Sequence, residues 1–223
     1  MNGLRYENKY FISRAAYEQL RTRIGAGLWS DDHANGGRYL IRSLYFDDYA
    51  DSGLHDKIDG VEKREKFRIR FYDMDDSFIR LESKQKLGQM TRKLSAPLTR
   101  TQVEQILAGD IWWMLQSEHP LIRNFYLKLR TRLLRPAVIV DYLREPYVFE
   151  DVRITFDMEL HSGVWNTDLF ERDLLTAPVF PSDRMILEVK YDDALPYAVR
   201  KLLGTVPLAR SAISKYELCR QFQ

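Results

Sequence analysis

The stretch Arg64-Glu65-Lys66-Phe67-Arg68-Ile69-Arg70-Phe71 decides the fold, because a cation recurs at every second residue and apolar residues alternate with the cations from Lys66 onward. Successive side chains of a β-strand point to opposite faces of the sheet. The stretch therefore predicts a strand with a cationic face (Arg64, Lys66, Arg68, Arg70) and an apolar face (Phe67, Ile69, Phe71). The segment 78–86 repeats this alternation, and the two are expected to form a hairpin around the turn-rich residues 73–77.

Most of the remaining chain also has strand character. Strands are predicted at 5–12, 41–46, 92–98, 137–142, 152–158, 185–191 and 213–218. Helices are predicted after Ser13 to residue 24, closed by Gly25 and Gly27; from a capping box at Thr101 and Glu104; at 112–115; from Pro120 to 129; and at 195–203, closed by Gly204. Residues 30–37 read as a loop. Many strands without alternating βαβ order indicate an antiparallel α+β fold.

Composition indicates an ordinary soluble protein. The 223 residues are 45% hydrophobic and 30% charged, which suits a single domain over residues 1–223. No apolar run approaches the ~20 residues that cross a bilayer, and the amino terminus lacks the apolar stretch of a signal peptide. One cysteine, Cys219, excludes an internal disulfide. We expect a cytoplasmic protein without direct membrane insertion.

The cationic strand faces have two interpretations. They could be the wetted outer face of an ordinary antiparallel sheet. Four like charges in a row repel one another, however, and nearly every predicted strand carries basic residues on one face. In a closed barrel that face would be the interior, where a cationic surface is tolerable only around an anion. Phosphate suits arginine best, so we expect a tunnel that holds a chain of phosphates.

The few carboxylates on the same faces are candidate metal ligands. A phosphate chain is usually handled with a hard divalent cation, Mn²⁺ or Mg²⁺, held by one or two carboxylates and by phosphate oxygens. Glu188, which shares a face with Lys190, is the first candidate, and Glu82 and Glu7 follow. The alternative for each glutamate is a salt-bridge partner.

Eight short motifs, read in order, resemble a known family. They are Glu7-Asn8-Lys9-Tyr10, Ser43-Leu44-Tyr45-Phe46-Asp47, Lys66-Phe67-Arg68-Ile69-Arg70, Glu82-Ser83-Lys84, Asp141-Tyr142-Leu143-Arg144, Arg153-Ile154-Thr155-Phe156-Asp157, Leu187-Glu188-Val189-Lys190 and Ser214-Lys215-Tyr216. Together they resemble the catalytic domain of the vacuolar transporter chaperone (VTC) family, within the triphosphate tunnel metalloenzyme superfamily. The resemblance implies a tunnel-shaped antiparallel barrel whose eukaryotic relatives polymerise phosphate from ATP with a divalent metal, typically manganese.

The resemblance also assigns roles to residues. It implies tunnel cations at Lys9, Arg68, Arg70, Lys84, Arg144, Arg153, Lys190 and Lys215, to which the strand pattern adds Arg64 and Lys66. Among these we expect Arg68, Arg70, Lys84 and Lys215 to act in catalysis. Tyr45 and Ser214 would be accessory phosphate contacts, and Glu188 the metal ligand. Arg5 stands where the broader superfamily often has a further glutamate, which removes one carboxylate from the metal site.

The predicted function is metal-dependent phosphoryl transfer from ATP to polyphosphate. Hydrolysis of tripolyphosphate or a nucleoside triphosphate in the same tunnel is the first alternative, and a non-catalytic polyphosphate or nucleotide sensor is the second. Nucleic acid is not expected as a partner, because the aromatic Phe67 and Phe71 alternate away from the cations. A membrane protein that acts together with this chain stays an open alternative.

Overall fold

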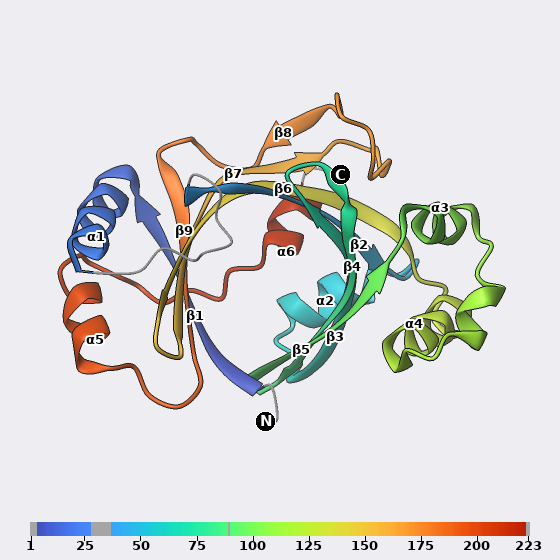
Figure 1. The fold of residues 1–223 in the computed structure, drawn as a ribbon, viewed down its shortest axis with the longest axis horizontal. Coiled ribbons are helices and arrows are strands. Elements are labelled where there is room, and N and C mark those ends of the chain that lie inside the picture. The colour runs from blue at the N-terminus through green and yellow to red at the C-terminus, as the bar shows by residue number, and fades with distance from the viewer. Residues whose placement is uncertain (1–3, 28–36, 89, 222–223) are drawn as a thin grey trace.

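Eight antiparallel strands close into a barrel in the computed structural model, which describes residues 4–27, 37–88 and 90–221. The strand order is β6-β2-β3-β4-β5-β1-β9-β7, and pairing between β6 and β7 shuts the ring, with the short β8 added beside β7 (Figure 1). The predicted α+β fold with an antiparallel tunnel is therefore confirmed.

The elements follow the alternation of the sequence closely. The strands are β1 Leu4–Ser13, β2 Tyr39–Asp47, β3 Lys63–Tyr72, β4 Asp75–Leu87, β5 Met90–Leu98, β6 Arg135–Phe149, β7 Val152–Gly163, β8 Thr176–Pro178 and β9 Arg184–Tyr191. The helices are α1 Arg14–Gly27, α2 Ser52–Ile58, α3 Arg100–Ala108, the 3₁₀ helix η2 Trp112–Gln116, α4 Pro120–Thr131, α5 Tyr197–Leu203 and α6 Lys215–Arg220.

The barrel turns its apolar residues outward and its charges inward. On the outer face of β3, Phe67, Ile69 and Phe71 are buried in one core with residues of α3, η2 and α4, and Phe67 stacks on Phe125 of α4. On the opposite side, α1 and α5 cover the outer faces of β1, β7 and β9 in a second core. Figure 1 shows these two helical layers flanking the ring. The helices remove the apolar outer faces from water.

The inward faces also carry a third core, in which Ile41, Val140 and Ile186 of β2, β6 and β9 are buried with Tyr216 of α6. Charged and polar side chains line the cavity that takes up the rest of the interior.

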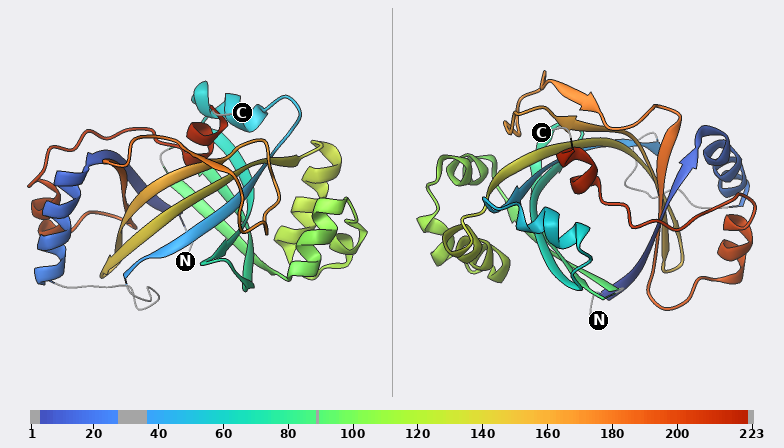
Figure 2. Two further views of the ribbon diagram at one scale, coloured as in Figure 1. Left: turned by 90° about the horizontal axis from the view of Figure 1, so that it is seen from above. Right: turned by 180° about the vertical axis from the view of Figure 1, so that it is seen from behind.

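One end of the barrel carries α2 and α6, as both views of Figure 2 show. The two helices meet at Asp47, the last residue of β2. Its carboxylate accepts hydrogen bonds from the backbone N–H of Gly53 at 2.8 Å and from the Tyr216 hydroxyl. Ion pairing of Arg220 with Asp51, at 2.6 Å, adds a second link between them. This end of the barrel is therefore fixed by contacts between distant parts of the chain.

Two local predictions were wrong. Residues 213–218 do not form a closing strand, because Ser214 caps a helix: its Oγ accepts the Glu217 backbone N–H at 3.3 Å. The capping box of α3 lies at Thr99 and Gln102, two residues before the predicted Thr101. Thr99 is extended where β5 ends, so its side chain is free to cap, whereas Thr101 is already inside the helix. Most of the predicted loop 30–37 lies outside the described residues.

Two short elements, α2 and β8, had no sequence prediction, while the other predicted strands and helices are present with shifted bounds. Among the described residues, no helix combines the length and hydropathy that crossing a membrane would require.

A buried carboxylate fastens α1 to the barrel. Glu145 of β6 is 3% exposed and accepts hydrogen bonds from Tyr17 at 2.7 Å, Arg21 at 2.9 Å and Arg38 at 2.7 Å, and also from Tyr147. Burial works against its ionised form, but the hydrogen bonds outweigh burial and lower the pKa of Glu145 below its ordinary value of 4.5. The ionised carboxylate therefore stabilises the folded protein.

We expect Glu145→Gln to lower the free energy of unfolding by about 2 kcal/mol at pH 7, since hydrogen bonds to a charged group are lost. A carboxyl group whose pKa is lower in the folded state contributes its stability above the ordinary pKa and loses it as the pH falls. The difference between the variant and the wild type should therefore shrink below about pH 4.5, as followed by thermal unfolding. Glu18→Gln, which breaks only an exposed pair with Arg14, is the control and should change little. A stability difference between Glu145→Gln and the wild type that stays constant with pH would contradict this account.

Candidate functional site

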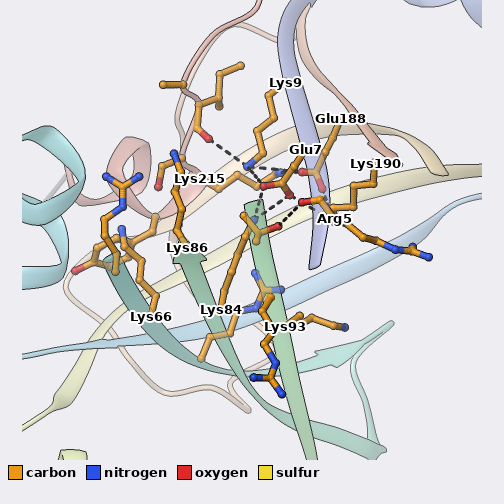
Figure 3. A pocket seen from close by; sticks show the side chains of 18 of the residues that line it. Arg5, Glu7, Lys9, Lys66, Lys84, Lys86, Lys93, Glu188, Lys190 and Lys215 are labelled. Carbon is orange, nitrogen blue, oxygen red and sulfur yellow. Dashed lines mark hydrogen bonds and ion pairs between the residues drawn. The ribbon is translucent and has the colours of Figure 1, made fainter. Parts of the chain in front are cut away.

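A single large cavity of about 850 Å³ fills the interior of the barrel in the described part of the chain. Fifteen lysines and arginines line it, against two glutamates, Glu7 and Glu188, although the whole chain has a net charge of only +2. Side chains from several strands converge on this space in Figure 3. Like charges gathered in one enclosed space repel, so the cavity is built to receive an anion.

The inward face of β3 carries four cations in a row, as the alternation predicted. Arg64, Lys66, Arg68 and Arg70 all line the cavity. At 3.2–3.4 Å per residue, the row is about 20 Å long. Lys66 lies nearest α6, where its Nζ stands 4.3 Å from the centre of the Tyr216 ring. The row can therefore contact a linear anion at several points along its length.

The last two cations of this row, Arg68 and Arg70, differ in how they are neutralised. Arg68 donates to a carboxylate oxygen of Glu82 at 2.6 Å and to the Tyr45 hydroxyl at 2.7 Å. Arg70 is 4% exposed and donates instead to the hydroxyls of Ser43, at 2.8 Å, and Tyr142, at 3.0 Å, while Glu82 is 3.9 Å away. Two hydroxyls orient the Arg70 guanidinium, and its carboxylate partner is farther away than that of Arg68, so the Arg70 charge is less neutralised than the Arg68 charge.

Glu7 and Glu188 lie together and share their lysine partners (Figure 3). Lys9 is 3.9 Å from Glu7 and 3.7 Å from Glu188, and Lys190 is 3.5 Å and 2.5 Å from them. Lys84 completes the group at 2.6 Å from Glu7. Burial opposes ionisation of both carboxylates, but the lysines outweigh it: the pKa of Glu7 is lowered to about 2 and that of Glu188 well below its usual range. Both groups are therefore anionic at neutral pH.

A third buried carboxylate, Asp157, holds cations from two different elements. Arg144 donates to it through both Nε and Nη2, at 2.6 and 2.8 Å, and Lys215 of α6 lies 2.5 Å from it. Burial raises the pKa of Asp157, but Arg144 and Lys215 outweigh burial and lower it to about 2. This contact places Lys215 in the cavity, from a helix and not from the predicted strand.

Fourteen of the fifteen residues predicted for the site line the cavity. They are Glu7, Lys9, Tyr45, Arg64, Lys66, Arg68, Arg70, Lys84, Arg144, Arg153, Glu188, Lys190, Ser214 and Lys215. Glu82 is the exception, because its carboxylate is enclosed by Arg68, Arg70 and Lys93. Within the described ranges, no three His, Cys, Asp or Glu residues gather as metal ligands do. Of the three glutamates predicted as metal ligands, Glu7 and Glu188 line the cavity.

Sequence reasoning missed part of the lining. Five further cations contribute: Arg5, Lys86, Arg92, Lys93 and Arg210. Arg5 and Lys86 continue the two-residue spacing of Glu7 and Lys84, which is a signal that could have found them. Arg210 lies outside the strands, so no periodic pattern marks it. The aromatic residues Tyr39, Tyr72, Tyr142 and Tyr216 also line the cavity and were not predicted as site residues.

Comparison with protein families identifies the chain. The model of the VTC domain matches residues 4–222, nearly the whole length. The chain belongs to the VTC domain family. A comparison with curated proteins finds no match for this VTC domain.

Solved structures share the barrel of this VTC domain at low sequence identity. A putative adenylate cyclase from Vibrio parahaemolyticus superposes with a TM-score of 0.55 at 10% identity, covering 98% of each chain. A putative adenylate cyclase from Bacillus halodurans gives 0.51 at 14%, covering 91% of this chain and 88% of its own. The PH1819 protein of Pyrococcus horikoshii gives 0.52 at 13%, with 98% and 99% covered. These likenesses establish a shared barrel fold, and at such identities they establish the fold alone.

Proposed function

We propose that this VTC domain binds tripolyphosphate or polyphosphate in its tunnel and transfers the terminal phosphoryl group of ATP to the end of a polyphosphate chain. The observation that carries the proposal is the enclosed cavity with fifteen cations and two glutamates. Its volume lies within the ~300–1,000 Å³ of ordinary ligand sites, and a linear row of arginines and lysines complements a linear polyanion.

Transfer of this kind needs positioning and charge neutralisation more than covalent chemistry by the protein. The bond between the γ-phosphorus and its bridging oxygen to the β-phosphate breaks, and a bond to a terminal oxygen of the acceptor chain forms, with ADP as the leaving product. Arg68 and Arg70 are neighbours on the inward face of β3, where they would stabilise charge on the transferring group. Lys84 and Lys215, which reach the cavity from β4 and α6, would hold neighbouring phosphates.

A divalent cation fits the pair Glu7 and Glu188. Both carboxylates are ionised and buried at the cavity wall, and Mg²⁺ or Mn²⁺ is commonly bound by one or two carboxylates together with phosphate oxygens. Bound there, the metal would neutralise charge on neighbouring phosphates. Lys9 and Lys190, which now pair with both carboxylates, would then be available to the phosphate chain.

The test is to incubate the purified protein with ATP and Mn²⁺ and to resolve the phosphate products by chain length. A ladder of products longer than triphosphate is the expected result. Release of orthophosphate without longer chains would replace transfer by hydrolysis in the same tunnel. Tight binding of tripolyphosphate without turnover in Mn²⁺ or Mg²⁺ would leave a non-catalytic sensor. No measurable affinity for tripolyphosphate would overturn the proposal itself.

A further inference from the structure

The cationic row of β3 ends in an aromatic side chain. Tyr72 follows Arg70 by two residues, so it continues the inward face about 7 Å further along the strand, and it lines the same cavity. Tyr39 lines the cavity beside it, and the two ring centres are 5.7 Å apart with the planes at 71°. The lining therefore changes from guanidinium and ammonium groups to π-faces within one strand.

These rings lie at the end of the barrel opposite α6. Strand β2 runs from Tyr39 to Asp47, which contacts α2 and α6. Tyr72 is the last residue of β3 and pairs with Ile41, near the start of β2. The Tyr39 and Tyr72 rings thus mark one end of the cavity, while Lys66 and Lys215 lie toward the other.

The aromatic group continues to the surface. Phe78, on β4, is 50% exposed, and its ring centre lies 6.1 Å from that of Tyr72. At the inner side, Arg153 donates to the Tyr39 hydroxyl at 3.1 Å, so Tyr39 has a partner for its polar atom. We call Tyr39, Tyr72 and Phe78 the aromatic end. These rings lie between the cationic row of β3 and solvent.

We infer that the aromatic end binds the base of a nucleoside triphosphate, whose phosphates extend along β3 toward α6. The inference rests on the proposed binding of phosphate in the tunnel and adds the orientation of the substrate. A polyphosphate chain gains nothing from the π-faces of these rings, whereas every nucleobase has a π-face that stacks on them. Stacking without a fixed pattern of donors and acceptors is tolerant of sequence, so ATP and GTP should bind with similar affinity.

The test compares the affinities of ATP and tripolyphosphate by calorimetry in EDTA, where metal-dependent turnover cannot intervene. Tyr72→Leu keeps apolar volume but removes the π-face. We expect this variant to bind ATP about 5- to 150-fold more weakly, the equivalent of ~1–3 kcal/mol of stacking. Its affinity for tripolyphosphate should stay within twofold of that of the wild type. Tyr49→Leu, at a tyrosine that is 81% exposed and does not line the cavity, is the matched control and should change neither affinity.

The outcomes distinguish failure of the base site from failure of phosphate binding in the tunnel. A selective loss of ATP affinity in Tyr72→Leu supports the base site. Equal losses for ATP and tripolyphosphate, or a loss of ATP affinity smaller than fivefold, overturn it while phosphate binding stands. A wild-type protein that binds neither ligand would instead remove the proposed function. Tyr39→Leu provides a second variant in case Tyr72→Leu fails to fold, and the same selective loss is expected from it.

Discussion

Arg70→Ala should reduce turnover by about 10³-fold or more, while the barrel stays folded. Arginines that stabilise charge on a transferring phosphoryl group are worth about 10³–10⁵ in rate. Arg70 is oriented by the Ser43 and Tyr142 hydroxyls, and its nearest carboxylate, Glu82, lies 3.9 Å away. The steady-state rate of product formation from ATP measures the effect, and tripolyphosphate affinity should fall with it.

Arg80 offers a matched control for this experiment. It stands directly opposite Arg70 in the pairing of β3 with β4, but it does not line the cavity and instead lies over the Phe78 ring, 4.5 Å from its centre. Arg80→Ala should therefore keep most of the turnover. Arg70→Lys keeps the charge but loses the paired donors, so an intermediate loss is expected. Wild-type turnover by a folded Arg70→Ala protein would exclude Arg70 from the reaction.

Glu188→Gln should raise the Mn²⁺ concentration needed for half-maximal turnover by about 10²-fold or more. Binding of tripolyphosphate without metal should be unchanged or tighter. The substitution removes one negative charge and one metal-binding group from a cavity in which cations already predominate. The lysines that Glu188 now holds, Lys190 at 2.5 Å and Lys9 at 3.7 Å, would face the anion without competition. A titration of turnover against Mn²⁺, together with tripolyphosphate binding in EDTA, measures both effects.

Glu82→Gln tests whether Glu82 is a metal ligand or only a salt-bridge partner. The Glu82 carboxylate is enclosed by Arg68, Arg70 and Lys93, and the cations lower its pKa strongly in spite of burial. We expect this variant to alter tripolyphosphate binding through Arg68 and to leave the Mn²⁺ titration within about threefold of the wild type. If Glu188→Gln merely lowered the melting temperature and kept the Mn²⁺ titration unchanged, Glu188 would be a structural ion-pair partner.

The site residues that lie on strands could be predicted from the sequence, because alternation along a strand shows which side chains share a face. Two-residue alternation in β3 predicts that Arg64, Lys66, Arg68 and Arg70 point inward and Phe67 outward, and the structure agrees. The same signal extends to Tyr72, whose position after Arg70 continues the face. Local pattern is sufficient wherever one strand determines which way a side chain points.

Contacts between distant segments could not be predicted in this way. The strand predicted over residues 213–218 is instead a helix from Lys215, because Ser214 caps it and Tyr216 packs against Tyr45. The ion pair of Asp157 with Lys215 depends on that helix reaching the barrel interior. Which carboxylate pairs with which cation is likewise set by the three-dimensional neighbours, as the separation of Glu82 from Glu7 and Glu188 illustrates.

The pairing of β1 with β9, which joins the two ends of the chain, has a kinetic consequence. Leu4–Ser13 pairs with Arg184–Tyr191, so the barrel cannot shut until nearly the whole chain has been synthesised. Topologies dominated by such distant pairings fold slowly, on the scale of milliseconds to seconds or longer. Until then β1 and β7 present open edges, and the inward rows of like charge repel one another. A polyanion threaded among them would offset that repulsion, and would thus act as a counter-charge for assembly as well as a ligand.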